Sequence, residues 1–112
     1  MRENLGEFEQ LMLLAIMQLD GPDDDVYGIR IVDEIERRAG RRVSPAAVYI
    51  TLRRLETKGL LASRMSAPTG EPGGKARRCV RVTKAGVTAL RGARQTIDRM
   101  WQGIDLRARS GK

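Results

Sequence analysis

The chain has no histidine, one cysteine and few aromatic residues, and these shortages exclude several kinds of site. Without histidine there is no Ser-His-Asp triad, no Cys-His pair and no imidazole ligand for a metal ion. A lone cysteine, Cys79, cannot form an intrachain disulfide or a zinc knuckle, and it suits a reducing cytoplasm. We therefore predict a protein that is not an enzyme, has no metal or cofactor, and uses Cys79 for packing rather than as a reactive thiol.

Long apolar runs are also missing. The longest, residues 11–17, is much shorter than the roughly 18 residues of a membrane-spanning helix, and the first residues do not resemble a signal peptide. A chain of 112 residues has the usual size of one domain and buries only a modest core, which leaves room for an oligomer interface. We expect a cytoplasmic protein that does not enter a membrane.

Charge is plentiful and unevenly distributed. The net charge is +7. Residues 1–36 contain ten acids and two bases, whereas residues 37–112 contain nineteen bases and four acids. This asymmetry indicates a basic surface that meets a polyanion, with the acidic segment turned away from it. A basic surface that is merely solvated is the alternative.

Apolar spacing predicts two helices in the first forty residues. The first covers residues 5–19 and is apolar on nearly all sides, so it is expected to be buried on more than one. Asp25, the last residue of an acidic turn, can cap a second helix over residues 27–39. Gly40 ends that helix.

A third helix is bounded by clear signals. Ser44 is a good N-cap, Pro45 is favoured at the first helical position, and Gly59 ends the helix after Lys58. At 100° per residue, Val48, Leu52 and Leu55 share a narrow arc that must face the core. The opposite arc contains Ala46, Tyr49, Ile50, Arg53 and Thr57, with Arg54 at its edge.

The remaining sequence predicts a hairpin and a last helix. Residues 60–66 and 77–83 alternate as strands around a Gly- and Pro-rich loop, and Thr83 can cap a helix that runs to about Arg107. An apolar seam on this helix needs something to pack against, either a second subunit or the first helix. The seam contains Val87, Leu90, Ile97, Trp101 and Ile104.

Three helices followed by a basic hairpin is the order of a winged helix-turn-helix. We therefore predict a mainly α fold with a small β-hairpin, in which residues 1–83 form a DNA-binding domain. Residues 84–107 form a dimerisation helix, and residues 108–112 a disordered tail. The two-fold axis of such a dimer would bring Trp101 close to its own copy.

In a winged helix the third helix lies in the major groove of double-stranded DNA and the hairpin grips the backbone. Arg53 can reach guanine acceptors, Ile50 can pack on a thymine methyl, and Tyr49 can donate to a phosphate. Small residues at the start of the helix allow close approach to an anion. Wing residues Lys75, Arg77 and Arg78 supply attraction that ignores sequence. The alternatives are a half-buried Tyr49 and solvated arginines.

Five segments together resemble the PadR family of bacterial transcriptional regulators, across roughly residues 5–91. They are LGEFEQLMLLAI, VYGIRI, SPAAVYITLRRLETKGLL, GGKARRCVRVTKAG and ALR. The chain is similar to the short-tailed subfamily, in which one C-terminal helix mediates dimerisation. The resemblance implies a homodimeric repressor, often released by a small molecule. Some relatives use an aromatic pair to sandwich flat apolar compounds, which makes Trp101 a candidate effector site.

The resemblance also implies which residues contact DNA. Two departures from the family are Ile50, where threonine or proline is common, and Cys79-Val80, in a strand segment that is usually aromatic. A basic protein-interaction module, whose last helix pairs with another protein, is the competing function. The matching positions are Tyr27, Gly28, Ser44, Ala47, Tyr49 and Arg53 on the helices, and Gly74, Lys75, Arg77 and Arg78 in the wing.

Overall fold

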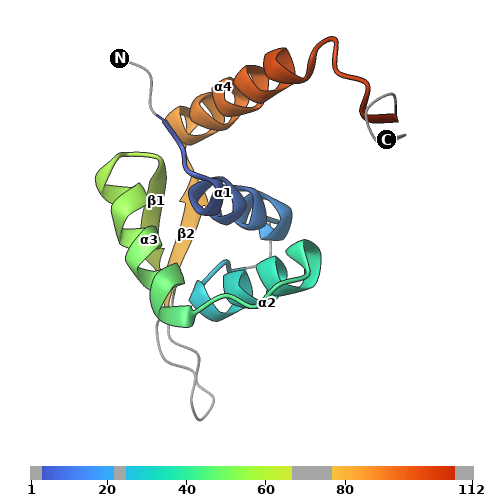
Figure 1. Cartoon of the computed structure of the whole chain (residues 1–112). Coiled ribbons are helices and arrows are strands. Elements are labelled where there is room, and N and C mark those ends of the chain that lie inside the picture. Colours follow the sequence, from blue (N-terminus) through green and yellow to red (C-terminus); the bar gives the residue numbers. More distant parts are fainter. Residues whose placement is uncertain (1–3, 22–24, 67–76, 108–112) are drawn as a thin grey trace.

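A computed structural model describes residues 4–21, 25–66 and 77–107 (Figure 1). Figure 1 shows α1 at the centre, with α2 beside it and the two strands between α1 and α3. This arrangement is the predicted mainly α fold with a small hairpin. The elements are α1 (Glu7–Leu19), α2 (Gly28–Ala39), α3 (Pro45–Thr57), β1 (Leu61–Met65), β2 (Arg78–Val82) and α4 (Lys84–Trp101).

The ends of α2 and α3 follow the sequence signals. Gly40 adopts a left-handed φ of 69° and ends α2, because glycine has no Cβ to oppose this conformation. The Ser44 hydroxyl accepts a hydrogen bond of 3.3 Å from the Ala47 N–H at the start of α3. Gly59, with φ 78°, follows the C-cap Lys58. The predicted boundaries of α3 are confirmed.

Asp25 does not cap α2, contrary to the prediction. Tyr27 is the N-cap residue, and no side chain caps it. The Asp25 carboxylate instead forms an ion pair of 2.7 Å with Arg64 on β1, and its carbonyl accepts a hydrogen bond from Arg30. The Asp25 carboxylate therefore pairs with an arginine that is distant in the sequence and does not cap the helix next to it.

The strands form the predicted antiparallel hairpin, with Leu61 opposite Val82 and Met65 opposite Arg78. On β2 the neighbours Cys79 and Val80 are both buried, although successive residues of a strand point to opposite faces. The Val80 N–H donates to the Val26 carbonyl at 2.9 Å, so the segment before α2 covers the second edge of β2. Cys79 is a free, buried cysteine, as expected of a packing residue.

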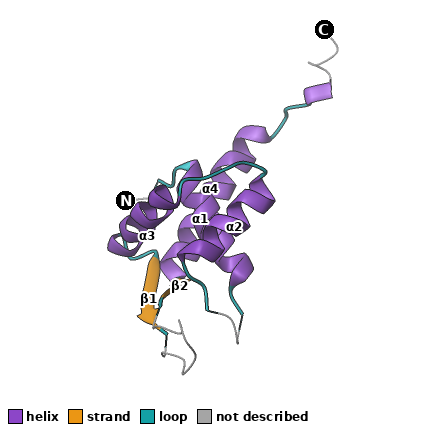
Figure 2. Cartoon of the chain, turned by 90° about the horizontal axis from the view of Figure 1, so that it is seen from below, coloured by secondary structure: helices purple, strands orange, loops and turns teal. Residues whose placement is uncertain are grey.

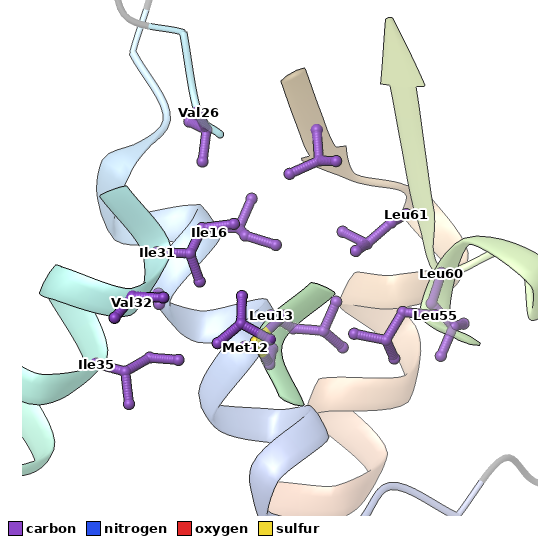
Figure 3. Close-up of a cluster of buried hydrophobic side chains, with 13 residues drawn as sticks. Met12, Leu13, Ile16, Val26, Ile31, Val32, Ile35, Leu55, Leu60 and Leu61 are labelled. Carbon is purple, nitrogen blue, oxygen red and sulfur yellow. The ribbon is translucent and has the colours of Figure 1, made fainter. Parts of the chain in front are cut away.

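The core forms where α1 meets α2, α3 and the hairpin (Figure 3). Val48 and Leu55 point into it from α3, and Leu52 packs at its margin, as the helical arc predicted. On α1, Leu13 is fully buried while Leu14 and Met17 remain nearly half exposed. The largest fully buried side chains are Met12, Leu13, Ile16, Ile31, Val48 and Leu55.

The last helix begins against the bundle and then leaves it. The Thr83 hydroxyl caps α4 through a 3.1 Å hydrogen bond from the Gly86 N–H. Gly86 lies against the Leu60 carbonyl, where an added Cβ would be only 2.4 Å from the oxygen. Figures 1 and 2 both show α4 extending past the other helices toward the C-terminus. It ends at Trp101 rather than near Arg107, because the C-cap Gln102 has a non-helical ψ of 131°, and Gly103 then takes a left-handed φ of 81°.

Candidate nucleic-acid interface

The outer face of α3 is open to solvent, as the sequence predicted. Tyr49 is 55% exposed and Ile50 62% exposed. Arg53 and Arg54 lie beside them and are exposed. The face is therefore a continuous strip with one aromatic hydroxyl, one branched apolar group and two guanidinium groups. Of the other predicted contacts, Ser44 and Ala46 are exposed and Ala47 is half-buried.

Arg53 is the cation of this strip that is most available to a ligand. No carboxylate in the described part of the chain lies within ion-pair distance of it. Arg54 is different, because it lies near enough to Glu9 to help lower the pKa of that carboxyl. A partner with hydrogen-bond acceptors could thus bind the Arg53 guanidinium without displacing a described carboxylate.

The base of the hairpin places Arg77 and Arg78 in different surroundings. The Arg77 guanidinium lies over the Tyr27 ring, 4.5 Å from its centroid, in a cation–π contact. Arg78 instead forms an ion pair of 2.5 Å with Glu56 of α3. Gly74 and Lys75, also predicted to contact DNA, lie outside the described residues.

Glu56 was not among the predicted site residues, yet it joins α3 to both strands. One carboxylate oxygen accepts a hydrogen bond of 2.5 Å from Ser63 on β1, and the other accepts from Arg78 on β2. The bond from Ser63 and then the Arg78 guanidinium hold the pKa of Glu56 below its ordinary value. Its place on the outer side of a helix gave only a weak sequence signal, since both partners come from later strands.

The acidic first part of the chain is not set apart from the basic part as expected. Glu7 pairs with Arg41, Glu9 with Lys58 and Asp25 with Arg64. Three of the bases on the later elements are therefore paired with acids of the first part, and a net positive charge remains.

The predicted seam on α4 divides into two halves. Val87 and Leu90 are partly buried, and Leu90 packs against the core. Ile97 and Trp101 are each 52% exposed, and Ile104 beyond the helix is 45% exposed. An open groove follows the inner side of α4, lined by Leu5, Lys58 and Leu60 from the bundle. The inner half of the seam has an intramolecular partner, and the outer half has none among the described residues.

No group of three histidine, cysteine or carboxylate residues in residues 4–21, 25–66 and 77–107 is arranged to hold a metal ion. No helix there is long and apolar enough to cross a membrane.

Comparison with known proteins identifies the family. The Transcriptional regulator PadR-like family matches residues 13–92. Transcriptional regulator Rv3488 of Mycobacterium tuberculosis is 35% identical over 96 residues, which cover 86% of this chain and 85% of that protein.

Solved structures agree with the sequence matches. A PadR family regulator from Eggerthella lenta is 28% identical, with a TM-score of 0.64 over 87% of this chain and 81% of that one. Bacillus subtilis PadR, crystallised in complex with operator DNA, is 14% identical and shares the fold, with a TM-score of 0.61 over 77% of this chain and 45% of that one. This protein belongs to the PadR-like family of transcriptional regulators, with a winged-helix fold, and is not an enzyme.

Proposed function

We propose that this regulator binds double-stranded DNA in a sequence-specific way, as a homodimeric repressor that a small molecule releases. The observation that carries the proposal is the outer face of α3. It exposes Arg53, Ile50 and Tyr49 side by side, and no described carboxylate pairs with Arg53. Such a strip matches the hydrogen-bond acceptors, methyl groups and phosphates of a major groove.

Each side chain of the strip has a role that follows from its chemistry. The Arg53 guanidinium can donate two parallel hydrogen bonds to O6 and N7 of a guanine. Ile50 can pack on a thymine methyl, and the Tyr49 hydroxyl can donate to a phosphate oxygen. Arg77 at the base of the wing adds attraction to the backbone that does not depend on sequence. The operator complex of the Bacillus subtilis relative supports a DNA-bound form of this fold.

The homodimer rests on α4. The exposed outer half of the seam, with Ile97 and Trp101, would pair with the same surface of a second copy across a two-fold axis. Leu14 and Met17 on α1, also nearly half exposed, would extend the buried apolar area. Pairing of this helix with a different protein is the competing outcome, and the assembly state in solution separates the two.

The effector would bind where the two copies meet. Trp101 lies at the end of α4 with half of its surface exposed, so two copies can present a pair of indole rings to a flat apolar compound. A plain packing role for Trp101 is the alternative. Binding to DNA and the single buried cysteine are consistent with a cytoplasmic protein.

Binding to the DNA upstream of its own gene tests the proposed function. We expect protection of one discrete segment in a footprinting experiment at physiological salt, with an affinity at least about a thousandfold above that for random DNA of equal length. Equal affinity for both DNAs would contradict sequence-specific binding. Sequence-specific binding that raises transcription would contradict the proposed repression but not the proposed DNA binding.

A further inference from the structure

Gly28 at the start of α2 lies against Tyr49 of α3. A Cβ built on Gly28 would be 2.4 Å from Cε1 of the Tyr49 ring and 2.5 Å from both Cζ and the hydroxyl oxygen. Real side-chain carbons do not approach so closely, so the ring occupies the space that any other residue at this position would fill.

The backbone does not require a glycine at this position. Among the described glycines, positive φ occurs at Gly40, Gly59 and Gly103, and Gly28 is not one of them. Gly28 is the first residue of α2, and glycine in a helix is generally less favourable than alanine. Contact with Tyr49 is therefore the physical reason for the missing side chain.

The contact restricts a side chain that is otherwise free to move. Tyr49 is 55% exposed, and its hydroxyl donates to no acceptor within the described ranges. Next to Gly28, Tyr27 carries the Arg77 guanidinium over its ring. The start of α2 thus contacts one side chain of α3 and one from the base of the wing.

We propose that Gly28 is a positioning residue for Tyr49, and that its missing side chain sets where the Tyr49 hydroxyl meets a DNA phosphate. The inference rests on the proposed DNA-binding function, which it deepens. Gly28 acts through the ring and not by touching DNA itself. An added methyl group displaces the tip of Tyr49, an exposed side chain, and leaves the core intact.

A double-mutant cycle separates this role from direct contact. Gly28→Ala and Tyr49→Ala should each weaken operator binding by about tenfold, the usual effect of losing one charge-assisted hydrogen bond. Adding Gly28→Ala to Tyr49→Ala should cost less than about twofold more, because the ring that the methyl group displaces is gone. Gly92→Ala is the matched control, since a Cβ there meets nothing within 4 Å. The proposal would be overturned if the loss of operator affinity in the double variant equalled the product of the two single losses, or if Gly28→Ala alone lost no affinity.

Fluorine NMR tests the packing without DNA. The chain has two tyrosines, so 3-fluorotyrosine in a Tyr27→Phe background reports on Tyr49 alone. Gly28→Ala should move this signal toward that of a solvent-exposed tyrosine, whereas Gly92→Ala should not move it. An unchanged signal in Gly28→Ala would refute the positioning role whatever the DNA result. If the wild type binds no operator while Gly28→Ala still shifts the Tyr49 fluorine signal, the proposed DNA function is refuted but the contact between Gly28 and Tyr49 is not.

Discussion

At the scale of single residues, the arginines of this protein differ mainly in the partners they already have. Arg78 is paired with Glu56 and Arg64 with Asp25, so a phosphate would have to compete with a carboxylate for either. Among the described residues, the Arg77 guanidinium contacts only the face of the Tyr27 ring, so it can bind a phosphate without first losing a carboxylate partner. Arg53 has no described carboxylate partner. In the proposed function, we therefore expect Arg53 to read sequence and Arg77 to attract the DNA backbone.

Substituting Arg77 should weaken binding to all DNA alike. Arg77→Ala removes one phosphate contact, so the slope of log affinity against log salt should become shallower by about one unit, equally for operator and random DNA. Arg37→Ala is the control, because Arg37 pairs with Glu34 on α2 and that carboxylate keeps Arg38 as a partner. An unchanged slope in Arg77→Ala, measured by fluorescence anisotropy from low to high salt, would remove Arg77 from the interface.

Sequence reasoning recovered the outward side chains of α3 because helical periodicity is local. It placed Tyr49 and Arg53 on the exposed face from their spacing to Val48 and Leu55 alone. The contact between Gly28 and Tyr49 spans twenty-one positions and depends on how α2 crosses α3, which no local pattern contains. Asp25 was assigned to a helix cap for the same reason, since its actual partner Arg64 lies on β1.

At the scale of elements, two polar contacts hold the C-terminal end of α3. Lys58, the C-cap residue, donates a 3.0 Å hydrogen bond to the buried carboxylate of Glu9 on α1. Two residues earlier, Glu56 bonds to both strands. The helix α3 is thereby fixed to α1 on one side and to the strands on the other. If α3 reads DNA as proposed, these contacts set its orientation in the free protein.

The link between α1 and α3 should depend on pH. Burial raises the pKa of Glu9, but hydrogen bonds from the Gly6 N–H and from Lys58 outweigh it, and the pKa of the folded carboxyl lies below 4.5. The unfolded chain therefore binds the proton more tightly, and the stability that Glu9 contributes is complete above about pH 4.5 and is lost as the pH falls below that value.

Thermal melts followed by circular dichroism measure this contribution. Glu9→Gln should destabilise the protein by about 1–2 kcal/mol at pH 7, and the difference from wild type should shrink at pH 3.5. Glu7→Gln is the control, because its pair with Arg41 is exposed and should contribute at most about 1 kcal/mol. A difference that stays constant with pH would show that Glu9 acts through packing and not through its charge.

The outer half of α4 should decide assembly. Removal of residues 94–112 keeps Leu90, which packs against the core, and the partly buried Val87, and it deletes Ile97 and Trp101. We expect light scattering to show a dimer for the full chain and a monomer for the truncated one. Removal of residues 108–112 alone should leave the dimer. A dimer that survives the longer truncation would place the interface elsewhere, and a monomeric full chain would favour pairing with another protein.

The elements were predictable wherever their ends carry a local signal. Ser44, Pro45 and Gly59 bounded α3 correctly because capping and left-handed φ depend on single residues. The predicted end of α4 was wrong because the apolar spacing continues to Ile104, whereas the backbone already leaves the helix at Gln102 and turns at Gly103. Periodicity reports which positions need burial, and it does not distinguish a continuous helix from a helix followed by a turn.

At the scale of the whole molecule, the protein is elongated, with extents of 62 × 33 × 26 Å, because α4 leaves the bundle. Figure 1 shows the reading helix and the hairpin on the bundle, while α4 extends away from them. Contacts with a second copy along α4 would thus leave the outer face of α3 free for DNA. An effector bound at the paired helices would act on the spacing of the two reading helices, since α4 joins directly to β2 through Thr83.

Trp101 provides an intrinsic probe for such an effector. It is the only tryptophan, so its fluorescence should change when a planar cationic dye stacks its aromatic rings on the indole in the dimer. A compound that changes the emission should also lower operator affinity, and Trp101→Leu should abolish the effect on DNA while keeping the dimer. If the emission does not change with any of a set of planar dyes, the effector role of Trp101 is rejected and only its packing role remains.

The most direct measurement of the central claim, that α3 reads DNA sequence, is the affinity of Arg53→Ala for the operator and for random DNA under the same salt conditions. The account predicts a loss of about 1–3 kcal/mol on the operator and little change on random DNA, because only the operator offers the correctly placed guanine. Circular dichroism should show an unchanged fold, since Arg53 lies outside the core. Equal weakening on both DNAs would contradict the claim and reduce α3 to an element that positions the protein without reading sequence.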